Sequence, residues 1–206
     1  MSIRKKILAI SIGPVLVLGV ITLLFMLTMV KSSLMDEVQD ALKGTAAATL
    51  AAYDQNTGDY LESTNGDIWK GSYNISKSES LVDRIKENTG MDVTFFYGNK
   101  RIMTSALDKK GNRILGSEAG ERVVNQVIKG KKPFFSTNVS LDGTRNYGYF
   151  IPVYQNGTTD QVIGMVFVGT NKARKDAIVN KILGSIMMAL LVVMLLCIVT
   201  AMRMAR

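Results

Sequence analysis

The stretch MDVTFFYGNKRIMTS (residues 91–105) decides the fold class of this chain. Residues 91–97 are rich in β-branched and aromatic side chains, Gly98 and Asn99 are a two-residue turn signal, and residues 100–105 return as a second strand. The stretch therefore predicts an antiparallel β-hairpin.

A two-residue turn fixes the register of such a hairpin, so that Phe96 faces Arg101 and Val93 faces Thr104. Side chains alternate between the two faces of a strand. Arg101 and Thr104 are therefore expected on opposite faces, unless a bulge lies between them.

Helix signals flank the hairpin on both sides. Ser80 and Asp83 form a capping pattern for a short helix that ends at Gly90. After the hairpin, residues 118–128 are expected to form a second helix closed by Gly130.

Three more strand signals follow, and turn dipeptides separate them. They cover residues 133–141, 144–153 and 161–170, with turns at Asp142-Gly143 and Asn156-Gly157. Helices followed by paired strands predict an α+β domain with a five-stranded antiparallel sheet.

Residues 32–53 precede this domain and are predicted to form a long amphipathic helix, continuous with an apolar run before it. Apolar residues recur there at helical spacing, at Leu34, Val38, Ala41, Leu42, Ala48 and Ala52. The alanine-rich face of this helix has two interpretations: it packs on its own domain, or it forms the seam of a homodimer.

Residues 58–77 are rich in Gly, Asn, Asp, Ser and Tyr and contain Trp69, the only tryptophan. This composition predicts a loop. The loop is either a lid over a ligand pocket, because pockets combine apolar walls with a few polar groups, or a segment that Trp69 anchors to the core.

Two uncharged apolar runs, residues 7–30 and 182–202, frame the chain. Each reaches the ~20 residues that a helix needs to cross the hydrocarbon core, so two transmembrane helices are predicted. A cleaved signal peptide is the alternative for the first run, but its 24 residues exceed the ~7–15 of a typical signal. Residues 31–181 then form one domain on one side of the membrane, with enough chain for a core of its own.

Short basic flanks orient the chain in the cell membrane. Residues 1–6 carry three basic side chains and residues 203–206 carry two. Because cytoplasmic flanks retain Lys and Arg, both ends are expected in the cytoplasm and residues 31–181 outside it. Four basic residues between positions 172 and 181 indicate the opposite orientation, but they flank a long translocated domain, whose charges have little influence.

Composition excludes several function classes. All 17 acidic residues and 20 of the 25 Lys and Arg lie between the two runs, so the domain has a net charge of +3, against +8 for the chain. Basic patches with interleaved aromatics are missing, which argues against nucleic-acid binding. Without histidine, and with Cys197 alone inside the second run, the sequence predicts no enzyme, metal site, cofactor or disulfide in the domain.

Several segments together resemble a single Cache sensor domain. They are DIWKG, TGMDVTFF, RIMTS, YFIPVY and IGMVFVG, at residues 67–71, 89–96, 101–105, 149–154 and 163–169. Such domains are PAS-like and extracytoplasmic, and usually precede a HAMP linker in bacterial methyl-accepting chemotaxis proteins. The sequence departs from that pattern by ending soon after the second run, so it is interpreted as a receptor truncated there or as a naturally short protein.

The resemblance implies a small-molecule pocket on the sheet, beneath the loop and helix that precede the first strand. Arg101 suits a carboxylate ligand, because a guanidinium can bind it through two parallel hydrogen bonds; a solvated strand-edge charge is the alternative for this residue. The full set of expected ligand-binding residues is Trp69, Lys70, Tyr73, Arg101, Thr104, Ser105, Tyr147 and Tyr149.

The function expected from this resemblance is that of a dimeric transmembrane chemoreceptor module. It would bind a small extracellular ligand, an organic anion, and transmit a conformational signal through the second transmembrane helix to downstream signalling proteins. Two alternatives remain: the sensor half of a histidine kinase or cyclic-dinucleotide enzyme, and a membrane-anchored binding protein without an output domain.

Overall fold

The computed structural model describes the backbone of residues 3–204 and the side chains of residues 12–203. The predicted cytoplasmic ends, residues 1–6 and 203–206, therefore lie partly outside the described residues. The chain divides into two compact units: a helical unit that contains the chain up to Asp36 and from Arg174 on, and a sensor unit, Glu37–Ala173.

The helical unit consists of parts of two long helices. The first, α1 (Ile3–Asp54), is a single uninterrupted helix, and the second is α4 (Lys172–Met204). Both are long and apolar enough to cross a membrane, with mean hydropathies of 2.4 and 3.0 and apolar windows in which no residue is buried. The helices touch at Gly19, where an added Cβ would lie 2.8 Å from the sulfur of Met194.

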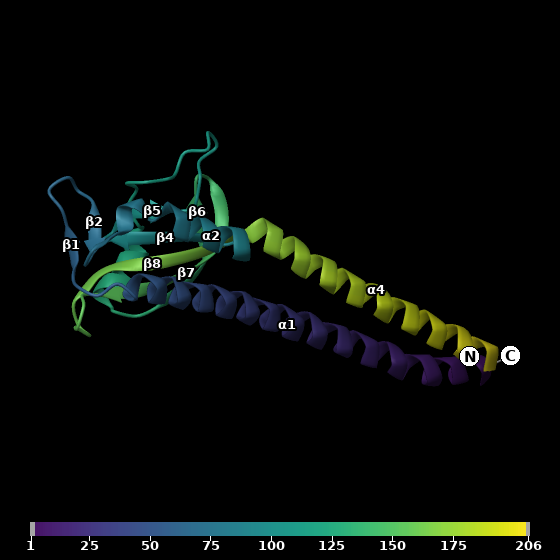
Figure 1. Cartoon of the computed structure of the whole chain (residues 1–206). Helices are drawn as coiled ribbons and strands as arrows, with labels where there is room; N and C mark the ends of the chain where they lie inside the picture. Colours follow the sequence, from purple (N-terminus) through teal and green to yellow (C-terminus); the bar gives the residue numbers. More distant parts are fainter. Residues whose placement is uncertain (1–2, 205–206) are drawn as a thin grey trace. The chain divides into compact units, whose positions relative to one another are not determined.

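The sensor unit is built on a five-stranded antiparallel sheet, as the sequence predicted (Figure 1). The order of its strands is β5-β4-β8-β7-β6. The bounds are β4 (Asp92–Tyr97), β5 (Lys100–Thr104), β6 (Phe134–Leu141), β7 (Thr144–Tyr154) and β8 (Val162–Asn171).

Short helices precede and interrupt this sheet. The predicted first helix is α2 (Glu79–Thr89), which Gly90 closes in a left-handed conformation with φ of 68°. Its N-cap is Ser78 rather than the predicted Ser80, because the short 3₁₀ turn η1 (Ile75–Lys77) runs directly into the helix. The predicted second helix consists of α3 (Glu121–Val123) and a π-helical turn, η2 (Val124–Lys129).

Residues 58–77 are not the loop that the sequence predicted. They contain a second, three-stranded antiparallel sheet, made of β1 (Tyr60–Glu62), β2 (Ile68–Lys70) and β3 (Tyr73–Asn74). Strands of two or three residues are too short to produce an alternating pattern, so composition alone suggested a loop. Trp69 lies in β2, opposite Leu61.

The β4–β5 hairpin starts in the predicted register and then departs from it. Phe96 pairs with Arg101, but a bulge follows, and Thr94 pairs with Thr104. The predicted pairing of Val93 with Thr104 was therefore wrong. Because one extra residue enters β5, Arg101 and Thr104 lie on the same face of the sheet.

The two faces of the sheet have different coverings. Helix α1 packs on one face through a stripe at helical spacing, and Tyr53 at the end of this stripe lies 5.2 Å from Phe95, ring to ring. The buried stripe comprises Val38, Leu42, Ala46, Thr49 and Tyr53. Residues 106–132 cover the opposite face, over a cluster of Phe96, Phe150, Met165 and Phe167.

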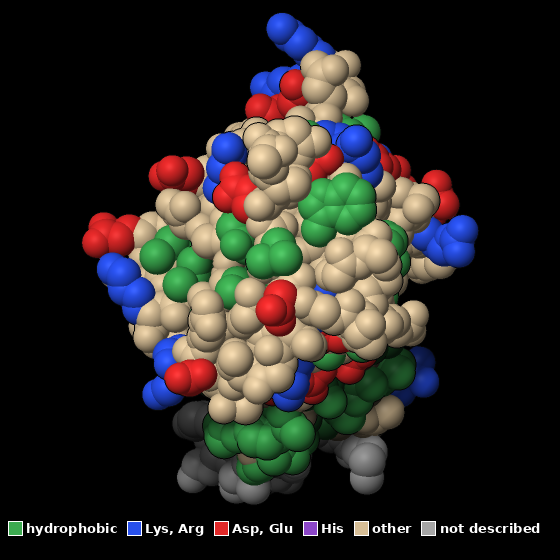
Figure 2. Space-filling view, turned by 60° about the vertical axis from the view of Figure 1, so that its left-hand side comes forward, with side chains coloured by type: hydrophobic (Ala, Val, Ile, Leu, Met, Phe, Trp, Pro, Cys, Tyr) green, Lys and Arg blue, Asp and Glu red, His purple; other side chains and the backbone are tan. Residues whose placement is uncertain are grey.

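The alanine-rich face of α1 is partly buried and partly exposed. Ala46 is buried in its own domain, whereas Ala47, Ala48 and Ala51 are exposed. Charged side chains of both signs are mixed over the face of the molecule in Figure 2, which agrees with the small net charge expected for the domain.

We expect Leu42→Ala to reduce the free energy of unfolding by about 2–5 kcal/mol, because Leu42 is fully buried and its loss leaves a cavity under α1. Lys43→Ala changes an exposed neighbour and should stay within about 0.5 kcal/mol. Urea titration followed by the fluorescence of Trp69, the only tryptophan, measures both. Equal losses in the two variants would contradict this packing of α1.

Candidate ligand-binding site

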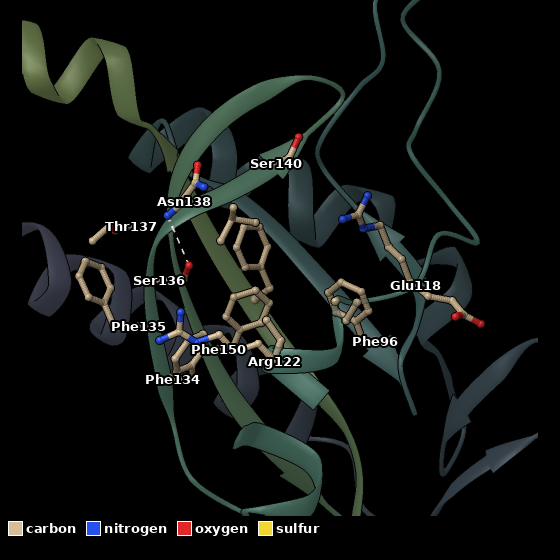
Figure 3. Close-up of a pocket in the computed structure, with 16 residues that line it drawn as sticks. Phe96, Glu118, Arg122, Phe134, Phe135, Ser136, Thr137, Asn138, Ser140 and Phe150 are labelled. Atoms are coloured by element: carbon tan, nitrogen blue, oxygen red, sulfur yellow. Dashed lines mark hydrogen bonds between the residues drawn. The ribbon is translucent and has the colours of Figure 1, made fainter. Parts of the chain in front are cut away.

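A pocket of about 520 Å³ lies on the Phe96 face of the sheet (Figure 3). Residues 118–123 form one wall and strand β6 forms the other. The remaining lining residues come from the sheet itself: Phe96, Arg101, Phe150 and Phe167. The sequence predicted a pocket beneath the loop and helix before the first strand, whereas the segment that covers this pocket follows β5.

The floor of the pocket is aromatic. The rings of Phe150 and Phe167 lie 4.8 Å apart between centroids. Phe167 lies flat over two glycines that face each other across strands β7 and β8, since a Cβ at Gly148 would meet its ring at 2.5 Å and one at Gly169 would meet it at 2.4 Å. Because neither glycine has a side chain, the ring of Phe167 lies close to the sheet and leaves space above it.

Arg101 contributes a buried cation to this pocket. It is 8% exposed, and its Nη1 donates to the carbonyl of Ile114 at 3.3 Å. Its guanidinium carbon lies 5.4 Å from the ring centroid of Phe96, and no described residue accepts a hydrogen bond from its buried Nε. Burial lowers the pKa of Arg101, yet a guanidinium stays protonated in proteins. An unpaired N–H on a buried cation favours a negatively charged partner.

Polar groups surround the rim. The guanidinium carbon of Arg122 lies 5.4 Å from the ring centroid of Phe134, and Glu118 belongs to the same wall as Arg122. Opposite them, Ser136 and Asn138 line the pocket from a part of β6 where the pairing with β7 shifts register. The arrangement can hold a small molecule with an apolar body and an anionic group near Arg101.

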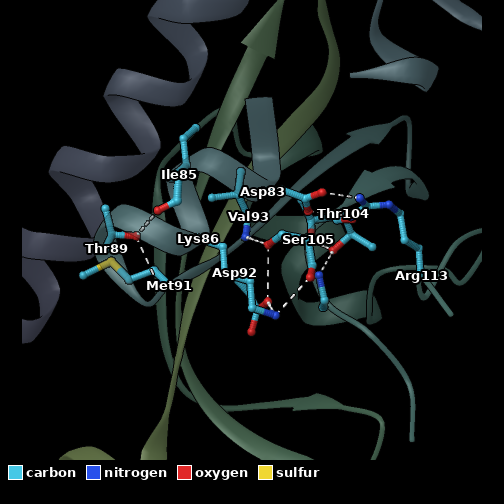
Figure 4. A network of polar contacts seen from close by, with 12 residues as sticks. Asp83, Ile85, Lys86, Thr89, Met91, Asp92, Val93, Thr104, Ser105 and Arg113 are labelled. Carbon is cyan, nitrogen blue, oxygen red and sulfur yellow. Dashed lines mark hydrogen bonds and ion pairs between the residues drawn. The ribbon is translucent and has the colours of Figure 1, made fainter. Parts of the chain in front are cut away.

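Of the eight predicted site residues, only Arg101 lines this pocket. Thr104 and Ser105 are buried within a polar network around β4 and β5 (Figure 4). The Thr104 hydroxyl lies 2.7 Å from that of Thr94, and the Ser105 hydroxyl accepts a hydrogen bond from the backbone N–H of Val93 at 2.9 Å. Both hydroxyls are therefore already hydrogen-bonded within the protein.

The other predicted residues lie away from the pocket lining. The buried ammonium of Lys70 forms an ion pair with Asp54 at 3.2 Å and lies 4.1 Å from the ring centroid of Tyr60. Trp69 and Tyr73 are half-buried in the small sheet. Tyr147 and Tyr149 are buried in β7; they alternate with Gly148, which lies under Phe167, and therefore face the opposite side of the sheet.

Sequence reasoning missed most of the pocket. The residues that it did not select include Arg122, Phe134, Ser136, Phe150 and Phe167. A signal existed in the second half of the chain, where Phe150 and Phe167 each stand next to a small or β-branched strand residue. Their convergence on Arg101 depends on the order of the strands, which local sequence does not specify.

Comparison with protein families gives a direct match. The family model for single Cache domain 3 matches residues 73–182, which is just over half of the chain. The chain belongs to the single Cache domain 3 family. The expected resemblance is thereby confirmed, and the sensor unit is a Cache domain. No curated protein matches the chain.

Solved structures share this fold at low sequence identity. The ligand-binding domain of the Campylobacter jejuni chemoreceptor Tlp3 in complex with L-valine superposes with a TM-score of 0.53 at 11% identity, covering 82% of this chain and 66% of that one. An extracellular ligand-binding receptor from Desulfohalobium retbaense superposes with a TM-score of 0.51 at 14% identity, covering 75% of this chain and 26% of that one. The Cache chain thus spans about a quarter of the second protein.

We expect Gly148→Ala to destabilise the Cache domain by about 1–3 kcal/mol, because the new methyl group would collide with the ring of Phe167 and with Val139. Gly120 lines the same pocket and has open space around it, so Gly120→Ala should be close to neutral. Chemical denaturation compares the two variants. A neutral Gly148→Ala would mean that Phe167 does not rest on this glycine.

The ion pair between Asp83 and Arg113 predicts a pH dependence. Arg113 donates to both carboxylate oxygens, with 2.9 Å between Nη1 and Oδ1, and this lowers the pKa of Asp83. A lowered pKa stabilises the fold above the ordinary value of about 4, and this contribution disappears as the pH falls through the lower folded pKa.

We therefore expect Asp83→Asn to have a lower melting temperature than the wild type at pH 7, and the two melting temperatures to converge as the pH falls through the lowered pKa of Asp83. Glu87→Gln on the exposed side of α2 is the control and should follow the wild type throughout. A constant difference between Asp83→Asn and wild type across this range would argue against the ion pair as its source.

Proposed function

We propose that this Cache domain is the sensory part of a membrane receptor that binds a small organic anion outside the cell. Arg101 lines the pocket, and its buried Nε has no acceptor among the described residues; these observations carry the proposal. A buried N–H without an acceptor is energetically unfavourable, and a bound carboxylate would satisfy it. The aromatic floor would receive the apolar part of the same molecule.

The membrane arrangement follows from the two apolar helices. In the proposed topology α1 and α4 each cross the membrane, both termini are cytoplasmic, and the sensor unit is extracytoplasmic. The receptor acts as a homodimer, with the exposed Ala47, Ala48 and Ala51 of α1 available for close helix packing. A ligand shifts the receptor between two arrangements only as far as its affinities for them differ.

The output that fits best is chemotaxis through a methyl-accepting signalling segment. The C. jejuni Tlp3 domain has the same fold and was solved with L-valine and with isoleucine. An amino acid is a second candidate ligand here, because Glu118 at the pocket wall can face an ammonium while Arg101 holds the carboxylate. The proposal involves neither catalysis nor a cofactor, and among the described residues no cluster of metal-ligating side chains is found.

A thermal-shift screen of the full chain in detergent micelles tests the ligand class. Trp69 is the only tryptophan and lies in the sensor unit, so its fluorescence follows the unfolding of that unit alone. The panel contains aliphatic and aromatic carboxylates, amino acids, amines and purines. A ligand at 100 times its dissociation constant should add about 2.7 kcal/mol to the stability.

We expect a carboxylate or amino acid to raise the melting temperature of the wild type and of Arg145→Ala, an exposed control, but not of Arg101→Ala. A stabilising compound that acts equally on Arg101→Ala would place the anion elsewhere. A hit restricted to amines or purines would contradict the proposed ligand class.

A further inference from the structure

Lys172 occupies the position where the Cache sheet becomes the second long helix. Strand β8 ends at Asn171, and Lys172 is the first residue of α4. Its ammonium donates a hydrogen bond to the carbonyl of Thr137 at 3.2 Å and lies 4.8 Å from the ring centroid of Tyr147. The start of α4 is therefore attached to strands β6 and β7 as well as to β8.

The Thr137 carbonyl accepts this bond where the β6–β7 ladder changes register, between Ser136 and Val139. At such an irregularity the backbone groups of the bulged strand lose their regular partners. Tyr147 is held in turn by Phe135, whose ring stacks on it at 6.4 Å with an interplanar angle of 10°. Lys172 thus contacts β6 at the point where its pairing with β7 is irregular.

The same segment forms a wall of the pocket. Residues 134–140 of β6 all line it, and the backbone N–H of Asn138 donates to the Ser136 hydroxyl at 3.4 Å across the irregularity (Figure 3). A molecule that lies against this wall of the pocket therefore contacts the segment whose backbone binds Lys172. The pocket and the first residue of α4 therefore both contact the same segment of β6.

We propose that Lys172 is the positioning residue that couples the pocket to α4, through the irregular segment of β6 at residues 136–139. Filling the pocket changes the pairing of this segment, which moves the Thr137 carbonyl relative to the Lys172 ammonium and changes how the first turn of α4 is held. This inference rests on the proposed function, because it takes the pocket to be the ligand site. It adds the route by which occupancy reaches the helix.

The test fills the pocket with a side chain, so that it needs no identified ligand. Ser136→Phe places a benzyl group in the 520 Å³ pocket, and Thr144→Phe adds the same group at an exposed position outside the lining. The readout is the rate of disulfide formation between Gly19→Cys and Met194→Cys, two neighbouring positions of α1 and α4. The full chain carries Cys197→Ser as well and is reconstituted in lipid nanodiscs.

With Lys172 intact, we expect Ser136→Phe to change the crosslinking rate at least about twofold relative to Thr144→Phe. Lys172→Met removes the ammonium and should abolish this difference, whereas Lys172→Arg keeps a cationic donor and should preserve it. A purely structural role for Lys172 would alter the basal rate in Lys172→Met without removing the response to Ser136→Phe.

Two results overturn the inference: no response to Ser136→Phe with Lys172 intact, or an equal response in Lys172→Met. Trp69 fluorescence verifies that each variant is folded, and Ser136→Leu replaces Ser136→Phe if the larger side chain prevents folding. The proposed function fails separately, in the carboxylate screen, because the crosslinking experiment contains no ligand.

Discussion

Strand β8 is the constraint on which the rest of the Cache domain depends. It pairs with β4 on one side and β7 on the other, and residues 164–170 are buried. Alternation sends Val166 and Val168 toward the α1 side, and Met165 and Phe167 toward the pocket side. One strand therefore supplies the centre of both hydrophobic layers, and the chain continues from its end directly into α4.

The pocket exists because a large ring of this central strand, Phe167, lies over one glycine of β7 and one of β8. Phe167 would fill the space above the sheet if Gly148 and Gly169 carried side chains, since their Cβ atoms would meet its ring at 2.5 and 2.4 Å. With the ring lying flat, Arg101 borders the cavity, and its buried Nε has no acceptor among the described residues. A cavity with an aromatic floor beside a buried cation is suited to an amphiphilic anion, which is the basis of the proposed ligand class.

Three cationic side chains of the domain differ in whether other groups compensate them. Lys70 is only 2% exposed, but Asp54 and the ring of Tyr60 compensate its charge. Arg113 is paired with Asp83 in the same way. Arg101 differs because its hydrogen bond to Ile114 leaves its Nε without an acceptor among the described residues. This contrast separates a structural cation from a candidate binding group.

The elements with strong local signals could be predicted from the sequence. Two uncharged runs predicted the two long apolar helices, the turn dipeptides predicted the β-hairpins, and Gly90 closed the predicted helix. The family resemblance, carried by five short segments, was confirmed over residues 73–182. These features follow from hydrophobicity, turn chemistry and spacing, which act between residues that are near one another in the chain.

The pocket and the finer geometry could not be predicted from the sequence, because they depend on tertiary contacts. The bulge that brings Arg101 and Thr104 to one face, the small sheet around Trp69, and the convergence of Phe134, Phe150 and Phe167 arise from contacts between distant segments. A local pattern can predict that the side chains of a strand alternate between two faces, but not which face packs against residues 118–123. That choice depends on how the whole sheet is ordered, because burial is shared among strands that the sequence separates.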